Sequence, residues 1–475
     1  MPRLIDESFT LRRLARRAGW RSRHLRERPP SRPVGAKLEL THACNLRCGF
    51  CYTDSPRHTV MRTPDLPDEA WHGIATEAAD LGVIEIVLTG GEPFLRRDLV
   101  LSLLENLSGR NVGLTLNTNG WFVDDSVADR LADVRGLQVD ISIDGATPAL
   151  HDASRGVPGS WRRAVEATSR LLDRGVRVQI VHVVTPLNQD DLDAFLEQMW
   201  TLGVTSVRAT PVVEVGAAAR GGRWAVNRDR LRRTIRAFAR SHGDGMRVAL
   251  QPGNAGVLAI HDHAAPAAML VRPTGAVMTD SLHPFSFGNA AEDGLEECWR
   301  RVREHWSDPQ ISRWAGSLRR SRDLASAEVI PYLNDEVPVG TGNGADVSSE
   351  SHVADPVPER AEPKDDAGDP ATNLARAREH VRRLALERRY RLGPALIGGG
   401  PGDHYVRQAE SGAVVRLNAT AALMLRELDD ATAAEAVDRL EGRFSGVDRS
   451  RLEGDVLDTG RSLARQGILV PAGPR

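Results

Sequence analysis

The sequence predicts an α/β protein, with a partial (βα)6 TIM-like barrel, an α+β extension, and a C-terminal winged-helix-like α+β domain. Two observations support this prediction. Short β-rich runs alternate with amphipathic helical stretches at intervals of about 25 to 45 residues, which is typical of βαβ units and a parallel sheet. A second group of strands and helices follows near the C-terminus, after a long stretch that is poor in apolar residues.

Six β-rich runs are expected to form the parallel sheet, with helices between them. The strands are expected at 38–41, 84–88, 113–116, 137–143, 176–184 and 206–211, and the helices include 68–81, 98–109, 161–174 and 190–202. Six units are too few to close an eight-stranded barrel, so the barrel is expected to be partial. In such folds the chemistry takes place on loops at the carboxyl ends of the strands.

The chain is expected to divide into five segments. These are a basic N-terminal extension (1–36), the barrel (37–225), the extension of mixed helices and a β-like piece (226–330), a flexible linker (331–377) and the C-terminal domain (378–475). The linker is rich in Gly, Pro, Ser, Asp and Glu, and such a composition buries too little apolar surface to order itself. The basic extension is either a solvated helix with a proline stop or an arm that recruits an acidic partner.

Composition excludes several classes of protein. The formal net charge of the 475 residues is −2, so neither a nucleic-acid partner nor a membrane surface is indicated. The start of the sequence has no signal-peptide pattern, and no apolar run is long enough to span a bilayer. Three of the four cysteines are clustered, which argues against a disulfide framework and for a reducing, cytoplasmic location.

The cysteine cluster is the strongest chemical signal. Cys44, Cys48 and Cys51 follow the first expected strand with C-x3-C-x2-C spacing. Three thiolates are one ligand short of a closed zinc site or a fully protein-ligated iron–sulfur cluster, so a metal centre here would keep an open position. A zinc site with Cys298 or His42 as fourth ligand and a redox-sensing thiol cluster are the alternatives.

Further polar elements fall at the ends of the next expected strands. Gly90, Gly91 and Glu92 follow the second strand, and the sequence Asn117-Thr118-Asn119-Gly120 follows the third. Ser142 and Asp144 follow the fourth, and Arg155 comes shortly afterwards. A glycine pair lets another group approach the backbone closely, carboxylates accept hydrogen bonds from amines and hydroxyls, and a guanidinium holds a carboxylate. Each element alone is a common turn sequence, but together they line one edge of the sheet.

Residues 37–225 resemble the radical S-adenosylmethionine (radical SAM) superfamily, on the spacing of the three cysteines and on Phe50 before the last of them. The resemblance implies that Cys44, Cys48 and Cys51 hold one [4Fe–4S] cluster and that SAM chelates its fourth iron. It further implies that Gly90, Gly91 and Glu92 contact the methionyl amine of SAM. Ser142, Asp144 and Arg155 would bind its ribose and carboxylate, and Tyr52 would lie at the adenine edge. Reductive cleavage of SAM would then give a 5′-deoxyadenosyl radical.

The middle region resembles the scaffold of a SPASM or twitch extension, on Arg272-Pro273-Thr274-Gly275 and on 287–289 and 295–299. Such extensions hold auxiliary clusters with several cysteines, whereas this region has only Cys298, and Thr279 or Asp280 stands where a ligand is expected. We therefore expect a degenerate extension that closes the barrel mouth and holds no auxiliary cluster. The sequence His261-Asp262-His263 is either a metal site or, as we expect, a polar loop.

The C-terminal block resembles the PqqD-like family, on residues 414–428 and on 463–470. That family recognises the leader segment of ribosomally made precursor peptides, which adds as an extra strand to an exposed sheet edge. The expected edge consists of Ala413, Val414, Val415, Arg416 and Leu417. A winged-helix nucleic-acid module is the alternative, but Glu453, Asp455 and Asp458 in the last helix disfavour contact with phosphates.

Together these features predict a radical SAM enzyme that modifies a precursor peptide held by its C-terminal domain. Its partners would be that peptide and a reductant such as flavodoxin or ferredoxin. Two alternatives remain open: a radical SAM enzyme that acts on a small molecule while its C-terminal domain docks a protein, and a non-catalytic metal-binding adaptor. The sequence names no catalytic hydrogen donor, and the bond that is formed or broken stays unknown.

Overall fold

A computed structural model describes residues 28–61, 64–220, 224–251, 265–281, 285–309, 311, 330–331, 369–393, 395–400, 403–408, 414–444, 446–466 and 468–472. Most of the basic N-terminal extension and most of the expected linker lie outside these residues, as do His261-Asp262-His263 and Ala413.

The main sheet has nine strands in the order β7-β6-β5-β4-β3-β2-β1-β8-β9, and every neighbouring pair except β8–β9 is parallel. Its strands are β1 (Gly35–Glu39), β2 (Glu85–Thr89), β3 (Gly113–Thr118), β4 (Leu137–Ser142), β5 (Arg177–Val184), β6 (Ser206–Pro211), β7 (Arg247–Leu250), β8 (Ala268–Val271) and β9 (Val277–Met278). The six expected strands are confirmed as β1 to β6. The region after the barrel supplies three more strands, which lengthen the same sheet at both edges.

Helices connect the strands, and those predicted from the sequence are present within three residues of their expected ends. They are α2 (Ser55–Met61), α3 (Asp68–Asp80), η2 (Pro93–Arg96), α4 (Arg97–Leu107), α5 (Asp125–Ala132), α6 (Pro148–Arg155), α7 (Ser160–Asp173), α8 (Leu192–Leu202), η3 (Gly216–Arg220), α9 (Arg228–His242), η4 (Gly243–Gly245) and α11 (Leu295–His305). Two short strands, β10 (Phe285–Ser286) and β11 (Ile330–Pro331), pair with each other.

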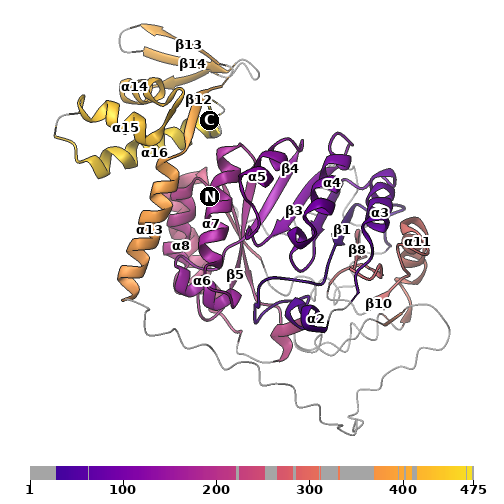
Figure 1. Cartoon of the computed structure of the whole chain (residues 1–475). Helices are drawn as coiled ribbons and strands as arrows, with labels where there is room; N and C mark the ends of the chain where they lie inside the picture. Colours follow the sequence, from indigo (N-terminus) through magenta and orange to yellow (C-terminus); the bar gives the residue numbers. More distant parts are fainter. Residues whose placement is uncertain are drawn as a thin grey trace.

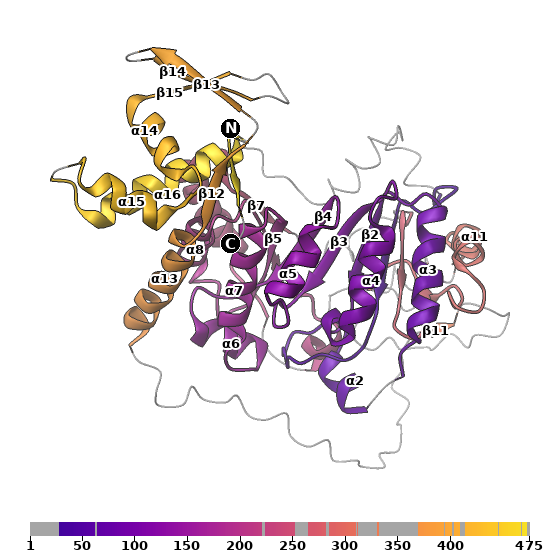
Figure 2. The ribbon, with the colours of Figure 1, turned by 45° about the horizontal axis from the view of Figure 1, so that its top comes forward.

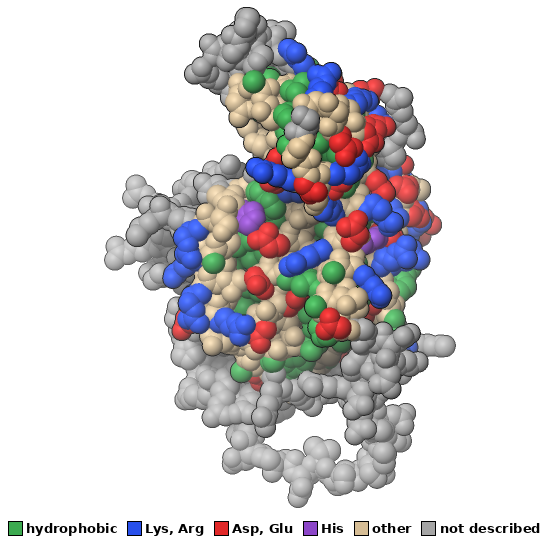
Figure 3. Space-filling model, turned by 90° about the vertical axis from the view of Figure 1, so that its left-hand side faces the viewer, with side chains coloured by type: hydrophobic (Ala, Val, Ile, Leu, Met, Phe, Trp, Pro, Cys, Tyr) green, Lys and Arg blue, Asp and Glu red, His purple; other side chains and the backbone are tan. Residues whose placement is uncertain are grey.

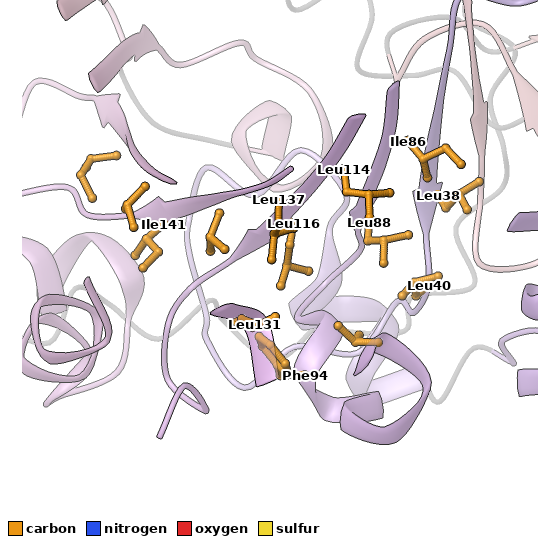
Figure 4. Packing of buried hydrophobic residues seen from close by; sticks show 14 of the residues in the cluster. Leu38, Leu40, Ile86, Leu88, Phe94, Leu114, Leu116, Leu131, Leu137 and Ile141 are labelled. Atoms are coloured by element: carbon orange, nitrogen blue, oxygen red, sulfur yellow. The ribbon is translucent and has the colours of Figure 1, made fainter. Parts of the chain in front are cut away.

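The two faces of the main sheet differ in polarity. Along β1 and β2, Leu38, Ile86 and Leu88 are fully buried in the main core, which the connecting helices complete. Figure 4 shows these side chains in one layer with Phe94 of η2 and Leu131 of α5. The alternate residues of the strands are largely polar and half-buried, as at Gln138 and Gln179. Because successive side chains of a strand point to opposite faces, one face of the sheet is apolar and packs against the helices, whereas the other is largely polar and faces the inside of the barrel.

The described residues of the C-terminal domain form two small sheets and four helices. Its elements are α13 (Pro370–Leu386), β12 (Arg389–Leu392), β13 (Ala395–Gly400), β14 (Asp403–Gln408), β15 (Val414–Leu417), α14 (Ala419–Leu428), β16 (Ala431–Thr432), α15 (Ala433–Glu441), α16 (Arg449–Arg465) and β17 (Leu469–Pro471). One sheet has the order β13-β14-β15 and the other β16-β12-β17. The neighbouring strands β12 and β13 thus belong to different sheets.

Helix α13 begins inside the range expected to be linker. Asp369 caps it by accepting a hydrogen bond from the backbone N–H of Thr372, and Pro370 occupies its first turn. The helix packs along α7 and α8 of the barrel and also contacts α15 and α16. Figures 1 and 2 both show α13 lying against the side of the barrel, with the rest of the C-terminal domain at its C-terminal end. The domain is thus docked on the barrel as well as tethered to it.

The surface of the docked C-terminal domain carries charges of both signs. Figure 3 shows acidic and basic side chains interspersed there. Across the residues that the structure describes, no helix is both long and apolar enough to cross a membrane.

Candidate functional site

The three clustered cysteines lie together on the loop that follows β1, at the carboxyl edge of the sheet. Cys48 is buried, and Cys44 and Cys51 are half-buried. They share a small apolar cluster with Leu46 and Phe50, separate from the main core. Burial raises the pKa of the Cys48 thiol to about 11, against the lowering influence of the Arg155 guanidinium. Apolar surroundings of this kind suit a thiolate-bound cluster.

The glycine pair after β2 positions this loop. A Cβ on Gly91 would lie 2.0 Å from the carbonyl oxygen of Ala43, and one on Gly90 would lie 2.7 Å from that of Thr41. The backbone N–H of Gly91 donates to Thr41 O at 2.7 Å, and that of Glu92 donates to Ala43 O at 2.8 Å. Only glycine permits so close an approach, so the pair holds the backbone that leads into Cys44.

Glu92 connects three of the strand-end loops. Its fully buried carboxylate accepts hydrogen bonds from Thr118 Oγ1 at 2.7 Å and from the backbone N–H of Asn119 at 2.8 Å. Asn119 Nδ2 in turn donates to Asn45 Oδ1 at 2.8 Å, inside the cysteine loop. Burial raises the pKa of Glu92 to about 7, although these donors lower it. The loop after β3 is thereby joined to the residue that follows Cys44.

Arg155 lies between a carboxylate and the cysteine loop. Its Nε is 2.5 Å from Asp144 Oδ2, its Nη1 donates to Cys48 Sγ at 3.8 Å, and its guanidinium lies over the ring of Phe50. Burial opposes its charge, but Asp144 more than compensates and raises the pKa of Arg155. Asp144 also accepts from the backbone N–H of Val183 at 2.7 Å. The pair places a fixed cation beside the sulfur of Cys48.

Two buried donors at this loop have no acceptor in the protein. Arg155 Nη2 and Asn45 Nδ2 are both shielded from solvent and make no hydrogen bond in the part of the chain that the structure describes. A buried donor without a partner costs about 1–3 kcal/mol, and a polar ligand bound at this position would satisfy both donors.

Tyr52 belongs to a polar group that the sequence did not reveal. Its hydroxyl accepts from Lys37 Nζ at 2.8 Å and donates to Glu39 Oε1 at 3.0 Å, and Glu39 Oε2 lies 2.6 Å from Arg272 Nη1. Burial raises the pKa of the Tyr52 hydroxyl to about 12. Two features of the sequence could have revealed this group: the charged residue Glu39 lies between two core leucines, and lysine is rare in this chain.

Other candidate ligands are not brought to the loop. Cys298 lies on α11 in the main core, and His42 Nδ1 is 2.7 Å from Asp65 Oδ1. Within the described ranges, no three His, Cys, Asp or Glu side chains are placed to hold a single metal ion. Cys298 and His42, the two candidates for a fourth zinc ligand, thus contact other parts of the protein. Ser142 ends β4 on the inner face of the sheet, half-buried.

The expected peptide-binding strand lies at a sheet edge. β15 pairs with β14 in antiparallel register, from His404 opposite Leu417 to Arg407 opposite Val414, and it has no second neighbour among the described strands. Val406 and Leu417 are buried in the core of the C-terminal domain. Such an edge presents unpaired backbone groups to a partner strand.

Comparisons with known proteins assign both regions. Residues 38–199 match the model of the radical SAM superfamily, and residues 404–469 match the model described as coenzyme PQQ synthesis protein D (PqqD). PqqA peptide cyclase of Rhizobium meliloti (strain 1021) is 30% identical over 188 residues, which are 40% of this chain and 49% of that protein. Pre-heme d1 synthase of Dinoroseobacter shibae is 33% identical over 224 residues, 45% of this chain and 54% of that protein.

The chain thus matches only about half the length of these relatives. Among solved structures, Streptococcus suis SuiB bound to S-adenosylmethionine superposes with a TM-score of 0.50 and 17% identity, over 67% of this chain and 75% of SuiB. At that identity the likeness shows the fold alone. The family of the matched barrel uses a [4Fe–4S] cluster and SAM. This chain therefore contains a region that matches the radical SAM superfamily, at 38–199, followed by a C-terminal region that matches PqqD, at 404–469.

Proposed function

We propose that this protein is a radical SAM enzyme that modifies a ribosomally synthesised precursor peptide, whose leader is held by the PqqD domain. The observation that supports this most directly is the combination of two sites in one chain. One is a loop of three thiols with two unpartnered buried donors, and the other is a small sheet with an open edge at β15.

The residues at the loop fit the cofactors of the family. Cys44, Cys48 and Cys51 would ligate one [4Fe–4S] cluster, and the iron without a cysteine would bind SAM. Together these groups supply one-electron cleavage of the sulfonium and, from it, hydrogen abstraction at an unactivated carbon. A flavodoxin or ferredoxin would be the reductant. An oxygen-sensitive cluster and four cysteines that form no disulfide favour a reducing, cytoplasmic location.

The surrounding side chains would bind and orient SAM. Arg155 offers its unpartnered Nη2 to a carboxylate, and Asp144 keeps that guanidinium in place. Ser142 would reach the ribose, and Tyr52 would lie at the adenine. Glu92 through its carboxylate and the glycine pair through its backbone hold the loops that would frame the methionyl amine.

The precursor's leader would add to β15 as an antiparallel or parallel fourth strand of the β13-β14-β15 sheet. Residues 414–417 supply the backbone groups, and Ala413, which lies outside the described residues, would extend the same edge. Backbone pairing provides affinity, and side-chain pockets beside the edge provide specificity.

The decisive experiment uses the short open reading frame encoded beside this gene. Its peptide should bind the full-length protein with micromolar or tighter affinity, and removal of residues 387–475 should abolish binding. Coexpression should shift the mass of the peptide, and the reduced enzyme should release 5′-deoxyadenosine from SAM. If no 5′-deoxyadenosine forms, the protein is a non-catalytic metal-binding adaptor instead.

The match to pre-heme d1 synthase favours one second candidate, a radical SAM enzyme that acts on a small molecule. In that case the PqqD domain would dock a folded protein. Affinity capture that recovers a folded protein and no short peptide would support this candidate over the first.

A further inference from the structure

The PqqD domain is fixed to one end of the barrel by two arginines. Arg388 Nη1 donates to Leu202 O at 3.0 Å, and its Nε donates to Asp173 at 2.7 Å. Arg461 Nη2 donates to Thr201 O at 2.9 Å, and its guanidinium lies 5.7 Å from the ring centre of Trp200. Arg388 is buried, as is most of Arg461.

These arginines complete the C-terminus of α8. The last carbonyls of a helix have no partner within it and carry partial negative charge, so they favour cations. The last turn of α8 has no basic residue of its own, and Gly203 ends the helix with a φ of 91°. A Cβ on Gly203 would lie 2.4 Å from Arg388 Nη1, so this helix end accommodates the incoming guanidinium closely. The docked position is therefore specific.

The chain order shows which end of the barrel this is. α7 connects the end of β4 to the start of β5, and α8 connects the end of β5 to the start of β6. The C-termini of both helices consequently lie beside the amino ends of the strands. The cysteine loop follows the carboxyl end of β1, so it lies at the opposite end of the barrel. Figures 1 and 2 agree, since the sheet β13-β14-β15 and α2, which follows the cysteine loop, lie at opposite ends of the molecule.

Helix α13 spans the separation between the two ends. Its residues from Asn373 to His380 line a pocket with Pro148 and Trp161, near the carboxyl end of β4, where the rings of His380 and Trp161 lie 5.8 Å apart between centres at a tilt of 48°. Its last turn leads directly into Arg388 at the other end. Seventeen residues of helix cover roughly 25 Å. An extended peptide needs about eight residues to cover that distance.

We infer that the docked PqqD domain sets a minimum spacing in the substrate, so that only residues at least about eight positions from the leader segment bound at β15 reach the cysteine loop. This inference rests on the proposed function and adds a rule for which residue of the peptide is modified. The precursor runs along the outside of the barrel from the β15 end to the mouth. Longer spacers remain substrates, because doubling a flexible span lowers effective concentration only about threefold.

The test uses the full-length enzyme and the peptide from the neighbouring open reading frame, after mass spectrometry has located the modified residue and leader binding has been mapped. Deletions between the two segments shorten the spacer to four residues, and insertions double it. The short-spacer peptide should bind with the parent affinity in fluorescence anisotropy and be modified at least tenfold more slowly. Modification of that peptide within twofold of the parent rate overturns the inference. Loss of binding by the parent peptide overturns the proposed function instead.

Neighbouring arginines give a matched pair of variants. Arg388→Ala removes the guanidinium contacts with Asp173 and with Leu202 O, which should loosen the docked position, so the short-spacer peptide should become a better substrate. Arg389→Ala removes contacts with Glu435 and Asp430, which both lie inside the C-terminal domain, and should keep the wild-type dependence on spacer length. A merely structural role for Arg388 would lower the rates for all peptides alike.

Discussion

Nε of Arg155 and Oδ2 of Asp144 lie 2.5 Å apart, and both side chains are buried beside the cysteine loop. A buried charge that loses its partner is strongly destabilising, whereas an exposed pair contributes little. This one contact therefore contributes to the stability of the barrel and also fixes the position of the guanidinium next to Cys48.

Asp144→Asn should lower the free energy of unfolding by about 3 kcal/mol, because it leaves the Arg155 guanidinium buried without a counter-charge. Urea unfolding followed by circular dichroism measures the change. Asp80→Asn is the matched control, since Asp80 pairs with Arg110 at 2.7 Å on the surface, with 66% and 40% of the side chains exposed. The control should lose no more than about 1 kcal/mol, and equal losses in both variants would contradict the assignment.

Gly91→Ala should displace the cysteine loop, because the new Cβ would meet the backbone of Ala43. We expect most of the iron bound after reconstitution to be lost, together with about 1–3 kcal/mol of stability. Iron analysis and thermal unfolding provide the two measurements. Gly73→Ala lies on helix α3, where a Cβ meets nothing within 4 Å. It should keep its iron and gain about 0.5–1 kcal/mol, so iron loss in both variants would argue against a local effect.

Cys48→Ala should abolish the iron–sulfur absorbance, and the wild-type chain should hold about four iron atoms. Cys298 serves as the control because it is packed in the main core, on α11. Cys298→Ala should retain the iron and lose about 1 kcal/mol of packing. About eight iron atoms per wild-type chain would show that the extension after the barrel holds a second cluster after all.

His151 should make the protein less stable as the pH falls. Its buried imidazole accepts a hydrogen bond from the backbone N–H of Asp144 at 3.0 Å, and burial lowers its pKa to about 3. Below pH 6.5 the unfolded chain binds a proton there that the folded protein does not bind, so stability falls by up to about 1.4 kcal/mol per pH unit. Urea unfolding at pH 7, 6 and 5 should show a flatter dependence for His151→Asn. Equal slopes for variant and wild type would be the contrary result.

Much of the barrel could be predicted because each strand and helix has a pattern of its own among residues that are close in the sequence. Alternation as at Leu38 and Leu40 marks each strand, and helical periodicity marks the connections. β7 is only four residues long and was not expected, and β8 was recognised only as β-like, since its pairing with β1 joins segments more than 200 residues apart. The spacing of Cys44, Cys48 and Cys51 similarly sufficed to locate the candidate site.

The contacts inside the site could not be predicted in the same way. Sequence position suggested that Glu92 and Asp144 face a ligand, whereas the structure gives both carboxylates protein partners, Asn119 and Arg155. The hydrogen-bond donors that pair with a buried carboxylate come from loops that are distant in the sequence, so the residues around the carboxylate do not reveal them. The start of α13 was missed although Asp369-Pro370 is a helix-start signal, because the arginine-rich sequence after it resembles the preceding linker in polarity.

The difference in polarity between the two faces of the main sheet determines which of its residues can be replaced without loss of the fold. Folding free energy comes chiefly from the leucines, isoleucines and valines that face the helices, whereas the inward residues of the same strands contribute little apolar burial. Many substitutions at inward positions such as Gln138 or Gln179 can therefore change the shape and hydrogen bonding of the lumen at small cost to folding. Descendants of one gene can thus acquire new substrates while the scaffold is inherited unchanged.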